Sequence, residues 1–122
     1  MSKVAPTLES LRDQLRQFAQ EREWQAFHTP KNLACALAVE ASELLENFQW
    51  LNTGELTELD QTVQLAVQQE MADVLNYLLM LADRLQVNLL DVAEQKIALN
   101  AQKYPIALAR GNAKKYHQIK NE

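Results

Sequence analysis

The sequence of 122 residues is poor in glycine, proline and cysteine, and each shortage excludes a class of protein or site. Gly54 and Gly111 stand alone, so they cannot build the glycine-rich phosphate loop of a Rossmann-type domain. Leucine and alanine far outnumber the β-branched residues, which argues against a β-sandwich or barrel. The single cysteine, Cys35, excludes an internal disulfide and a cysteine-based metal site. What remains is a mostly helical chain of ordinary domain size.

Long hydrophobic runs are also missing from the sequence. The longest apolar stretch, residues 33–39, is far too short to span a bilayer. Residues 1–10 lack the apolar core of a signal peptide. We therefore expect a cytoplasmic protein with no membrane partner.

Positive charge is scarce, because 12 basic residues stand against 16 acidic ones and the net charge is -4. A protein that binds a DNA or RNA duplex needs an excess of Lys and Arg at the phosphates, so we expect no such partner. A nucleotide ligand is still allowed, since a metal ion can supply the missing positive charge.

The apolar periodicity predicts four helices joined by short connections. Thr7 and Thr29 are suitable N-cap residues for the first two, and Pro30 suits the first helical position of the second. Because Pro105 cannot continue a helix, the fourth must end before it. The expected helices cover residues 8–23, 30–51, about 60–86 and 88–104. The sequence thus predicts an all-α fold: a four-helix-bundle-like single domain over residues 1–122, with a helical core at 7–105 and a basic tail at 106–122.

Two of these helices each carry a pair of acidic residues spaced i, i+3, and both pairs follow apolar stripes. At 100° per residue, Leu33 lies about 20° from Glu40, and Val63 lies about 20° from Glu70. The second members of the pairs, Glu43 and Asp73, lie at the edges of the stripes. The two pairs are therefore expected to face each other inside the bundle.

Such a pattern has a structural and a functional interpretation. One acidic pair is usually a solvated helix face, and this interpretation is kept for Glu46, Glu58, Asp83 and Glu94. Two pairs on apolar stripes favour a site, because uncompensated carboxylates in a core are costly. An oxygen-only pocket suits a hard cation, Mg²⁺ or alternatively Mn²⁺. Iron is disfavoured, since di-iron bundles use Glu-x-x-His and neither His28 nor His117 belongs to a pair.

The predicted fourth helix carries Lys96, Asn100 and Lys103 in one row, with Asn100 and Lys103 within about 40° of Lys96. Lysines at a helix edge can simply extend to solvent, but beside a carboxylate–metal pocket the better interpretation is contact with phosphate. Aromatic residues lie at helix ends or stripe edges, where they serve either as core or as base-stacking groups. They are Trp24, Phe27, Trp50, Tyr77 and Tyr104.

Four segments together resemble the MazG-like superfamily of all-α nucleoside triphosphate pyrophosphohydrolases. They read EREWQAFH at residues 21–28, EASELLENFQW at 40–50, EMAD at 70–73 and KIALNAQKYP at 96–105. The resemblance extends from about residue 7 to residue 116. Within the superfamily, the chain is most similar to the dCTP pyrophosphatase branch.

This resemblance implies an activity and a set of site residues. Members hydrolyse the α–β phosphoanhydride to a nucleoside monophosphate and pyrophosphate, as dimers or dimer-of-dimers tetramers with sites built partly from neighbouring chains. The implied Mg²⁺ ligands are Glu40, Glu43, Glu70 and Asp73. The implied nucleotide contacts are Trp24, Phe27, His28, Trp50 and Tyr77, and those near the phosphates are Lys96, Asn100, Lys103 and Tyr104. Animal members carry a histidine where this chain has Leu15, which bears on base selectivity and not on the reaction.

The sequence therefore predicts Mg²⁺-dependent hydrolysis of a deoxynucleoside triphosphate, with dCTP or modified dCTP favoured and Glu43 taking the proton from the attacking water. Alternatives within the superfamily are an all-α dUTPase and a broad hydrolase of non-standard nucleotides. From another class, the alternative is a non-catalytic helical module that binds nucleotide or oligomerises. Self-association is expected because Met71, Leu75 and Leu79 lie away from the Glu70 stripe and leave their helix apolar on most sides.

Overall fold

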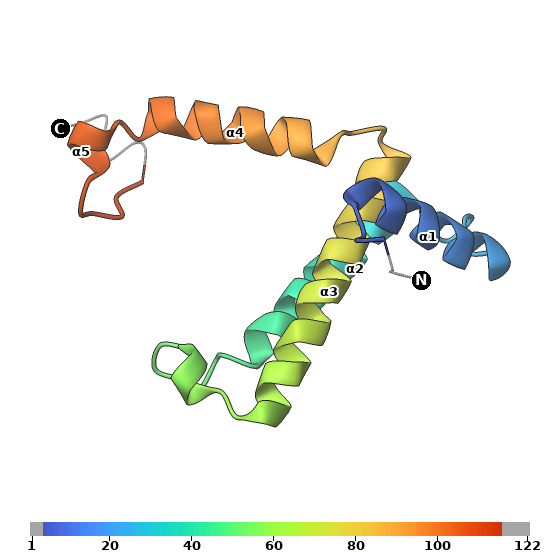
Figure 1. Ribbon diagram of the computed structural model, residues 1–122, viewed down its shortest axis with the longest axis horizontal. Coiled ribbons are helices and arrows are strands. Elements are labelled where there is room, and N and C mark those ends of the chain that lie inside the picture. Colours follow the sequence, from blue (N-terminus) through green and yellow to red (C-terminus); the bar gives the residue numbers. More distant parts are fainter. Residues whose placement is uncertain (1–3, 116–122) are drawn as a thin grey trace. The chain divides into compact units, whose positions relative to one another are not determined.

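The computed structural model describes residues 4–115, and the described part is helical with no β-strand (Figure 1). Its elements are α1 (Leu8–Glu21), α2 (Pro30–Glu46), the short 3₁₀ helix η1 (Leu56–Glu58), α3 (Gln61–Arg84), α4 (Leu89–Lys103) and α5 (Ile106–Ala109). The all-α fold class is confirmed, and all four predicted helices are present. The chain divides into two compact units, residues 1–86 and residues 87–122. The single domain over 1–122 stays a prediction, and each unit is described by itself.

Side-chain caps explain where the helices begin. The Thr7 hydroxyl accepts a hydrogen bond from the backbone N–H of Ser10, and the Ser10 hydroxyl accepts one from the backbone N–H of Thr7, which completes a capping box. Thr29 caps α2 at the N–H of Asn32, with Pro30 at the first helical position. Asp60 and Asn88 cap α3 and α4 in the same way. These starts agree with the sequence-based prediction.

The end of α2 differs from the prediction, because the helix stops at Glu46 and does not continue to residue 51. The side-chain amide of Asn47 donates to the carbonyl oxygen of Glu43 at 3.2 Å, and the N–H groups of Asn47 and Phe48 bond three residues back. This tighter bonding ends the α-helix in a series of turns. Trp50, which the predicted helix over residues 30–51 would include, therefore lies outside α2.

Helices α2 and α3 run antiparallel and side by side, and α1 packs against α3 at one end of the pair (Figure 1). Buried apolar side chains join the three helices: Ala19, Leu33, Val67, Leu79 and Ala82. Leu33 is 1% exposed, and burying a leucine side chain contributes about 2 kcal/mol. This small core fixes the relative register of α2 and α3.

The loop between α2 and α3 is a compact turn centred on Gly54. Gly54 has φ +74, and a Cβ added there would lie 2.7 Å from the Phe48 ring, so both conformation and space require glycine. The carboxylate of Glu58 accepts the backbone N–H groups of residues 52–54 and the Thr53 hydroxyl. These bonds lower the pKa of Glu58 to about 2, first through the Thr53 hydroxyl. Glu58 is thus a structural part of this loop, whereas the sequence had suggested a simple solvated residue.

The unit formed by residues 87–122 contains α4 and α5. Residues 90–103 of α4 are exposed throughout, and its apolar side chains include Ile97, which is 71% exposed. Of the predicted basic tail at 106–122, the part up to Lys115 is described, while Lys120 lies outside the described residues, as does His117. None of the helices among residues 4–115 is long and apolar enough to cross a membrane.

Candidate metal centre

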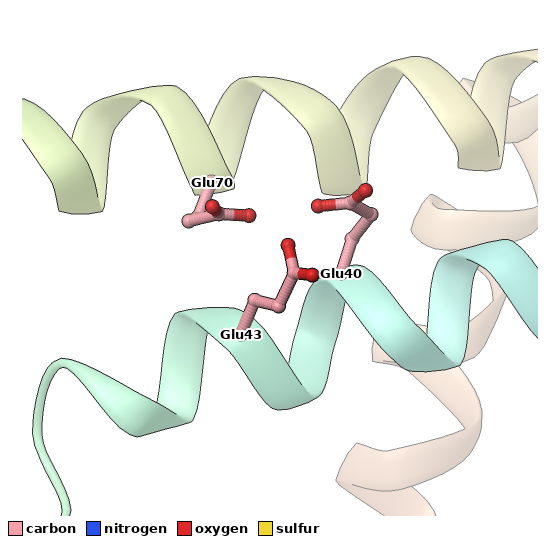
Figure 2. Close-up of side chains that lie close together, drawn as sticks. All are labelled: Glu40, Glu43 and Glu70. Carbon is pink, nitrogen blue, oxygen red and sulfur yellow. The ribbon is translucent and has the colours of Figure 1, made fainter.

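Three of the four predicted metal ligands converge between α2 and α3. Glu40 and Glu43 project from consecutive turns of α2, and Glu70 points toward them from α3 (Figure 2). Each residue offers a carboxylate oxygen, and these three oxygens all lie within 4.8 Å of one another. All three residues are half-buried. The spacing of three on α2 places both of its carboxylates on the side that faces α3.

Two oxygens in this group lack a hydrogen-bond partner. Glu40 Oε2 and Glu70 Oε2 are buried atoms that accept no hydrogen bond. Leaving a buried polar atom unpaired costs about 1–3 kcal/mol, and more when the group is charged. Three carboxylates this close also repel one another. The group therefore requires a proton or a cation to be stable.

The raised pKa of Glu40 shows how strongly this group of carboxylates favours a proton or a cation. A hydrogen bond shared with Glu70, which exists only when one of the two carboxyls is protonated, raises the pKa of Glu40 to about 7. Burial, a hydrogen bond with Glu43 and the charges of Glu43 and Asp73 act in the same direction. In the absence of a cation, a proton near neutral pH thus satisfies the unpaired oxygens.

Asp73 is the fourth predicted ligand, and the structure places it beside the group. It lies one turn after Glu70 on α3 and is exposed. Its charge contributes to the raised pKa of Glu40, so it lies within electrostatic reach of the three glutamates. The three-residue group itself does not include Asp73.

The donor set fits a hard divalent cation. All donors are carboxylate oxygens, and two of them are buried and unpaired. Mg²⁺ is commonly held by a few carboxylates while it keeps waters and takes phosphate oxygens as further ligands. Three half-buried glutamates with an exposed aspartate at the rim suit a site of this kind.

The predicted nucleotide contacts Trp24, Phe27 and His28 lie in the connection between α1 and α2, residues 22–28. The Trp24 ring meets the rings of Phe18 and His28 edge-on, with centroids 5.8 and 5.9 Å apart. Trp24 is nevertheless 41% exposed and Phe27 68%. These aromatic surfaces therefore remain available to a ligand.

Trp50 and Tyr77 lie elsewhere in the same unit. Trp50 is 89% exposed in the turns that follow α2, at the opposite end of that helix from Trp24. Tyr77 follows Asp73 by one turn on α3 and is half-buried. The structure thus distributes the predicted base contacts along α2 and α3 and does not gather them in one place.

The remaining predicted contacts belong to the unit of residues 87–122. Lys96, Asn100 and Lys103 are exposed on α4, and Tyr104 is half-buried at its C-cap. Their spacing keeps the first three in one row on the helix surface. Their placement with respect to the carboxylates stays a prediction.

Sequence reasoning missed a set of contacts at the end of α3. Arg16 on α1 forms a two-pronged ion pair with Asp83, and Arg84 donates a hydrogen bond to the carbonyl oxygen of Gln25 at 3.1 Å. The interpretation of Asp83 as a solvated residue is wrong, because its side chain is 20% exposed and binds Arg16. Periodicity along one helix cannot identify these contacts, since the partners are 67 and 59 residues apart.

Comparison with known proteins gives a consistent result. The model of the MazG-like family matches residues 35–119. The dCTP pyrophosphatase 1 of Rattus norvegicus is 43% identical over 116 residues, which cover 93% of this chain and 68% of that protein. The dCTP pyrophosphatase 1 of Homo sapiens is 41% identical over the same shares.

A solved structure agrees with these relatives. The crystal structure of a pyrophosphatase from Archaeoglobus fulgidus DSM 4304 has a TM-score of 0.75 and 40% sequence identity to this chain. The match covers 86% of this chain and 98% of that one. Together with the carboxylates between α2 and α3, these similarities show that the chain belongs to the MazG-like family and is a nucleotide pyrophosphohydrolase.

Proposed function

We propose that the protein hydrolyses dCTP or a modified dCTP to the nucleoside monophosphate and pyrophosphate, with Mg²⁺ as its cofactor. The observation that carries the proposal is the convergence of Glu40, Glu43 and Glu70, with two buried carboxylate oxygens that lack a partner. The preference for dCTP is supported by the relatives named dCTP pyrophosphatase 1. The cytoplasmic location stays a prediction.

The chemistry assigns separate tasks to the carboxylates. Glu40, Glu43, Glu70 and Asp73 would hold Mg²⁺, which when bound neutralises phosphate oxygens and lowers the pKa of a coordinated water. Because buried, unpaired oxygens belong to Glu40 and Glu70, these two residues are the better permanent ligands. Glu43 is then assigned as the group that takes the proton while the water oxygen attacks the α-phosphorus and pyrophosphate leaves.

The base contacts require more than one chain. Trp24 precedes α2 and Trp50 follows it, and the 17 residues of α2 span about 25 Å at 1.5 Å per residue. A single nucleoside triphosphate bound at Glu40 and Glu43 is too short to reach both tryptophans of one chain. We therefore assign Trp24 and Trp50 at one site to two copies of the chain.

Exposed apolar residues on α2 and α3 support this self-association, as a dimer or a dimer of dimers. Val39, Leu45, Leu65 and Met71 are each more than half exposed. Large exposed apolar areas on a protein of this size mark an interface. The prediction that Leu79 contributes to self-association is wrong, because Leu79 is buried in the core of residues 1–86.

The reaction is tested by following pyrophosphate release from dCTP, 5-methyl-dCTP, dUTP and dTTP with Mg²⁺. We expect pyrophosphate release to be fastest from a cytosine nucleotide and to be absent in the presence of EDTA. A preference for dUTP would support the dUTPase alternative. Similar rates on all four would support the broad hydrolase, and binding without turnover would leave only the non-catalytic module.

The shared site is tested by mixing two weakened variants, Trp50→Ala and Glu70→Gln. If one copy supplies Trp50 to the carboxylates of another, mixed oligomers contain some sites with both groups intact. Activity should then rise above that of either variant alone. No gain after verified subunit exchange, or a monomer by light scattering at micromolar concentration, contradicts the two-chain site.

A further inference from the structure

The last turn of α3 holds two other parts of the chain through adjacent residues. Asp83 accepts hydrogen bonds from Arg16 on α1, one from Nε to Oδ2 at 2.7 Å and one from Nη2 to Oδ1. Arg84 donates from Nη1 to the carbonyl oxygen of Gln25 at 3.1 Å. These are long-range contacts, which join residues 67 and 59 positions apart.

The Arg16–Asp83 contact differs from the other ion pairs of residues 4–86. Both Asp83 oxygens are engaged, and the Asp83 side chain is 20% exposed. The pairs of Arg12 and Arg16 with Asp13 and of Arg22 with Glu21 instead join residues close together on α1 or at its end. A bidentate arginine–carboxylate pair fixes orientation as well as distance, whereas exposed single pairs contribute little.

The segment that Arg84 holds is the aromatic loop, residues 22–28. Within the loop, the N–H groups of Phe27 and His28 donate to the carbonyl oxygen of Trp24. At its two ends, the N–H of Trp24 donates to the carbonyl oxygen of Ala19, and the side-chain amide of Asn32 donates to that of Phe27. Glu23 has a positive φ of 54°, which a residue other than glycine adopts at a cost of about 1 kcal/mol. A loop with such a residue needs contacts from outside to keep one conformation.

The residues of the Arg16–Asp83 and Arg84–Gln25 contacts line one pocket. Arg16, Gln25, Asp83 and Arg84 surround it together with His28, and its apolar wall includes Leu33 and Leu79. The pocket adjoins α2 and α3, the two helices that carry Glu40, Glu43 and Glu70. Helix α3 is continuous from Glu70 to Arg84, so it connects the carboxylates rigidly to the loop.

We propose that Asp83 and Arg84 are positioning residues: Arg84 holds the aromatic loop directly, and Asp83 holds α1, from which the loop continues, so that Trp24 and His28 are placed to contact the nucleotide. This inference rests on the proposed function, in which the loop contacts substrate. Without the contact from Arg84, the loop samples several conformations and has to be ordered when the nucleotide binds. The cost therefore falls on substrate binding, while the carboxylates that perform the chemistry stay in place.

The kinetic test compares three variants. Arg84→Met removes the donor and is expected to raise KM about tenfold, the effect of losing one hydrogen bond from a charged group, with kcat within about twofold. Arg84→Lys keeps one donor for the Gln25 carbonyl and should restore most of the affinity. Arg12→Met is the matched control, since Arg12 lines the same pocket but pairs with its neighbour Asp13. It should leave KM within about twofold of wild type.

Amide hydrogen exchange of residues 22–28 without nucleotide provides a measurement independent of activity. Arg84→Met and Asp83→Asn should both exchange faster in this loop, and Arg84→Lys and Arg12→Met should match wild type. Asp83→Asn keeps the side-chain shape, so it also serves if Arg84→Met does not fold. Wild-type exchange in Arg84→Met and Asp83→Asn, or a loss confined to kcat, overturns the inference.

The two proposals fail in different ways. If wild type hydrolyses no nucleotide, the proposed function fails and the exchange measurement still decides whether Asp83 and Arg84 hold the loop. If wild type is active and Arg84→Met has an unchanged KM, the positioning role fails while the proposed function stands.

Discussion

The α2–α3 pair and α4 carry opposite charge patterns, and the structure accounts for them to different degrees. On α2 and α3, acidic residues that lie 30 positions apart in sequence, Glu40 and Glu70, come together within residues 1–86. On α4, Lys96, Asn100 and Lys103 form an exposed row in the unit of residues 87–122. The first pattern is completed by the fold of one unit, whereas the contacts that the row on α4 makes stay a prediction.

This difference follows from what each helix buries. The α2–α3 pair has its own core around Leu33, Val67 and Leu79, which fixes the facing carboxylates. Helix α4 has no buried residue, and its apolar residues Leu90 and Ile97 are exposed. A side-chain arrangement can be inferred with precision only where packing holds it.

The largest expected effect on activity comes from removing one of the carboxylates between α2 and α3. Glu70→Gln or Glu40→Gln removes a carboxylate that we propose as a metal ligand and whose oxygen is buried and unpaired. Pyrophosphate release should fall about 10³-fold or more, because the transition-state charge loses its compensation. Glu46→Gln, at the exposed end of α2, is the matched control and should stay within about twofold of wild type. Equal activity of Glu70→Gln and Glu46→Gln would contradict the metal centre.

Changes on α4 should have a smaller effect and a different kinetic signature. Lys103→Met removes a cation assigned to the phosphates, so KM should rise about tenfold. Gln102→Met introduces the same side chain on the same helix, about 120° from Lys96, and should leave KM unchanged. If the two variants have the same KM, the row on α4 does not contact substrate. The opposite charges of α4 and of the α2–α3 pair would then have no common function.

The group of carboxylates between α2 and α3 was predicted well from the sequence, because its position follows from where the two helices begin and which of their faces are apolar. Thr7, Thr29 and Pro30 mark helix starts through backbone chemistry that neighbouring residues determine. The apolar stripes on α2 and α3 then predict which faces meet, and Glu40 and Glu70 lie on those stripes. Helical periodicity was therefore sufficient to bring three of the four carboxylates together.

Other features depend on particular side-chain contacts and were not predictable in this way. The amide of Asn47 ends α2 early, and Glu58 organises the loop that follows. The contacts of Asp83 and Arg84 join segments that no periodic pattern relates. Periodicity describes faces of helices, whereas these residues act through single bonds across turns and between distant segments.

The pH dependence of stability should distinguish a proton from a cation between α2 and α3. The pKa of Glu40 is about 7 in the folded protein against an ordinary 4.5. Between these values the folded state holds a proton that the unfolded state has lost, so this group's contribution declines as the pH rises through 7. In EDTA, the Tm of wild type should fall by a few degrees between pH 5 and pH 8 relative to Glu40→Gln. Added Mg²⁺ should oppose the fall, and a Tm difference independent of pH would contradict the assignment.

The smallest expected effect lies at the far end of the pair. Glu58→Gln weakens the hydrogen bonds to residues 52–54, so the Tm should fall by a few degrees at neutral pH. The pKa of Glu58 is lowered to about 2, so the wild-type advantage is present above about pH 4.5 and disappears as the pH falls through 2. Glu55→Gln is the control, because Glu55 is an exposed neighbour whose carboxylate lies outside these bonds. Equal Tm values for the two variants at neutral pH would exclude a structural role for Glu58.

The central claim is that the carboxylates of α2 and α3 support hydrolysis between the α- and β-phosphates, and product analysis by phosphorus NMR tests it most directly. Wild type incubated with dCTP and Mg²⁺ should yield dCMP and pyrophosphate, with neither product formed in EDTA or by Glu70→Gln. Formation of dCDP and inorganic phosphate, or the same products at the same rate without a divalent cation, would contradict the account.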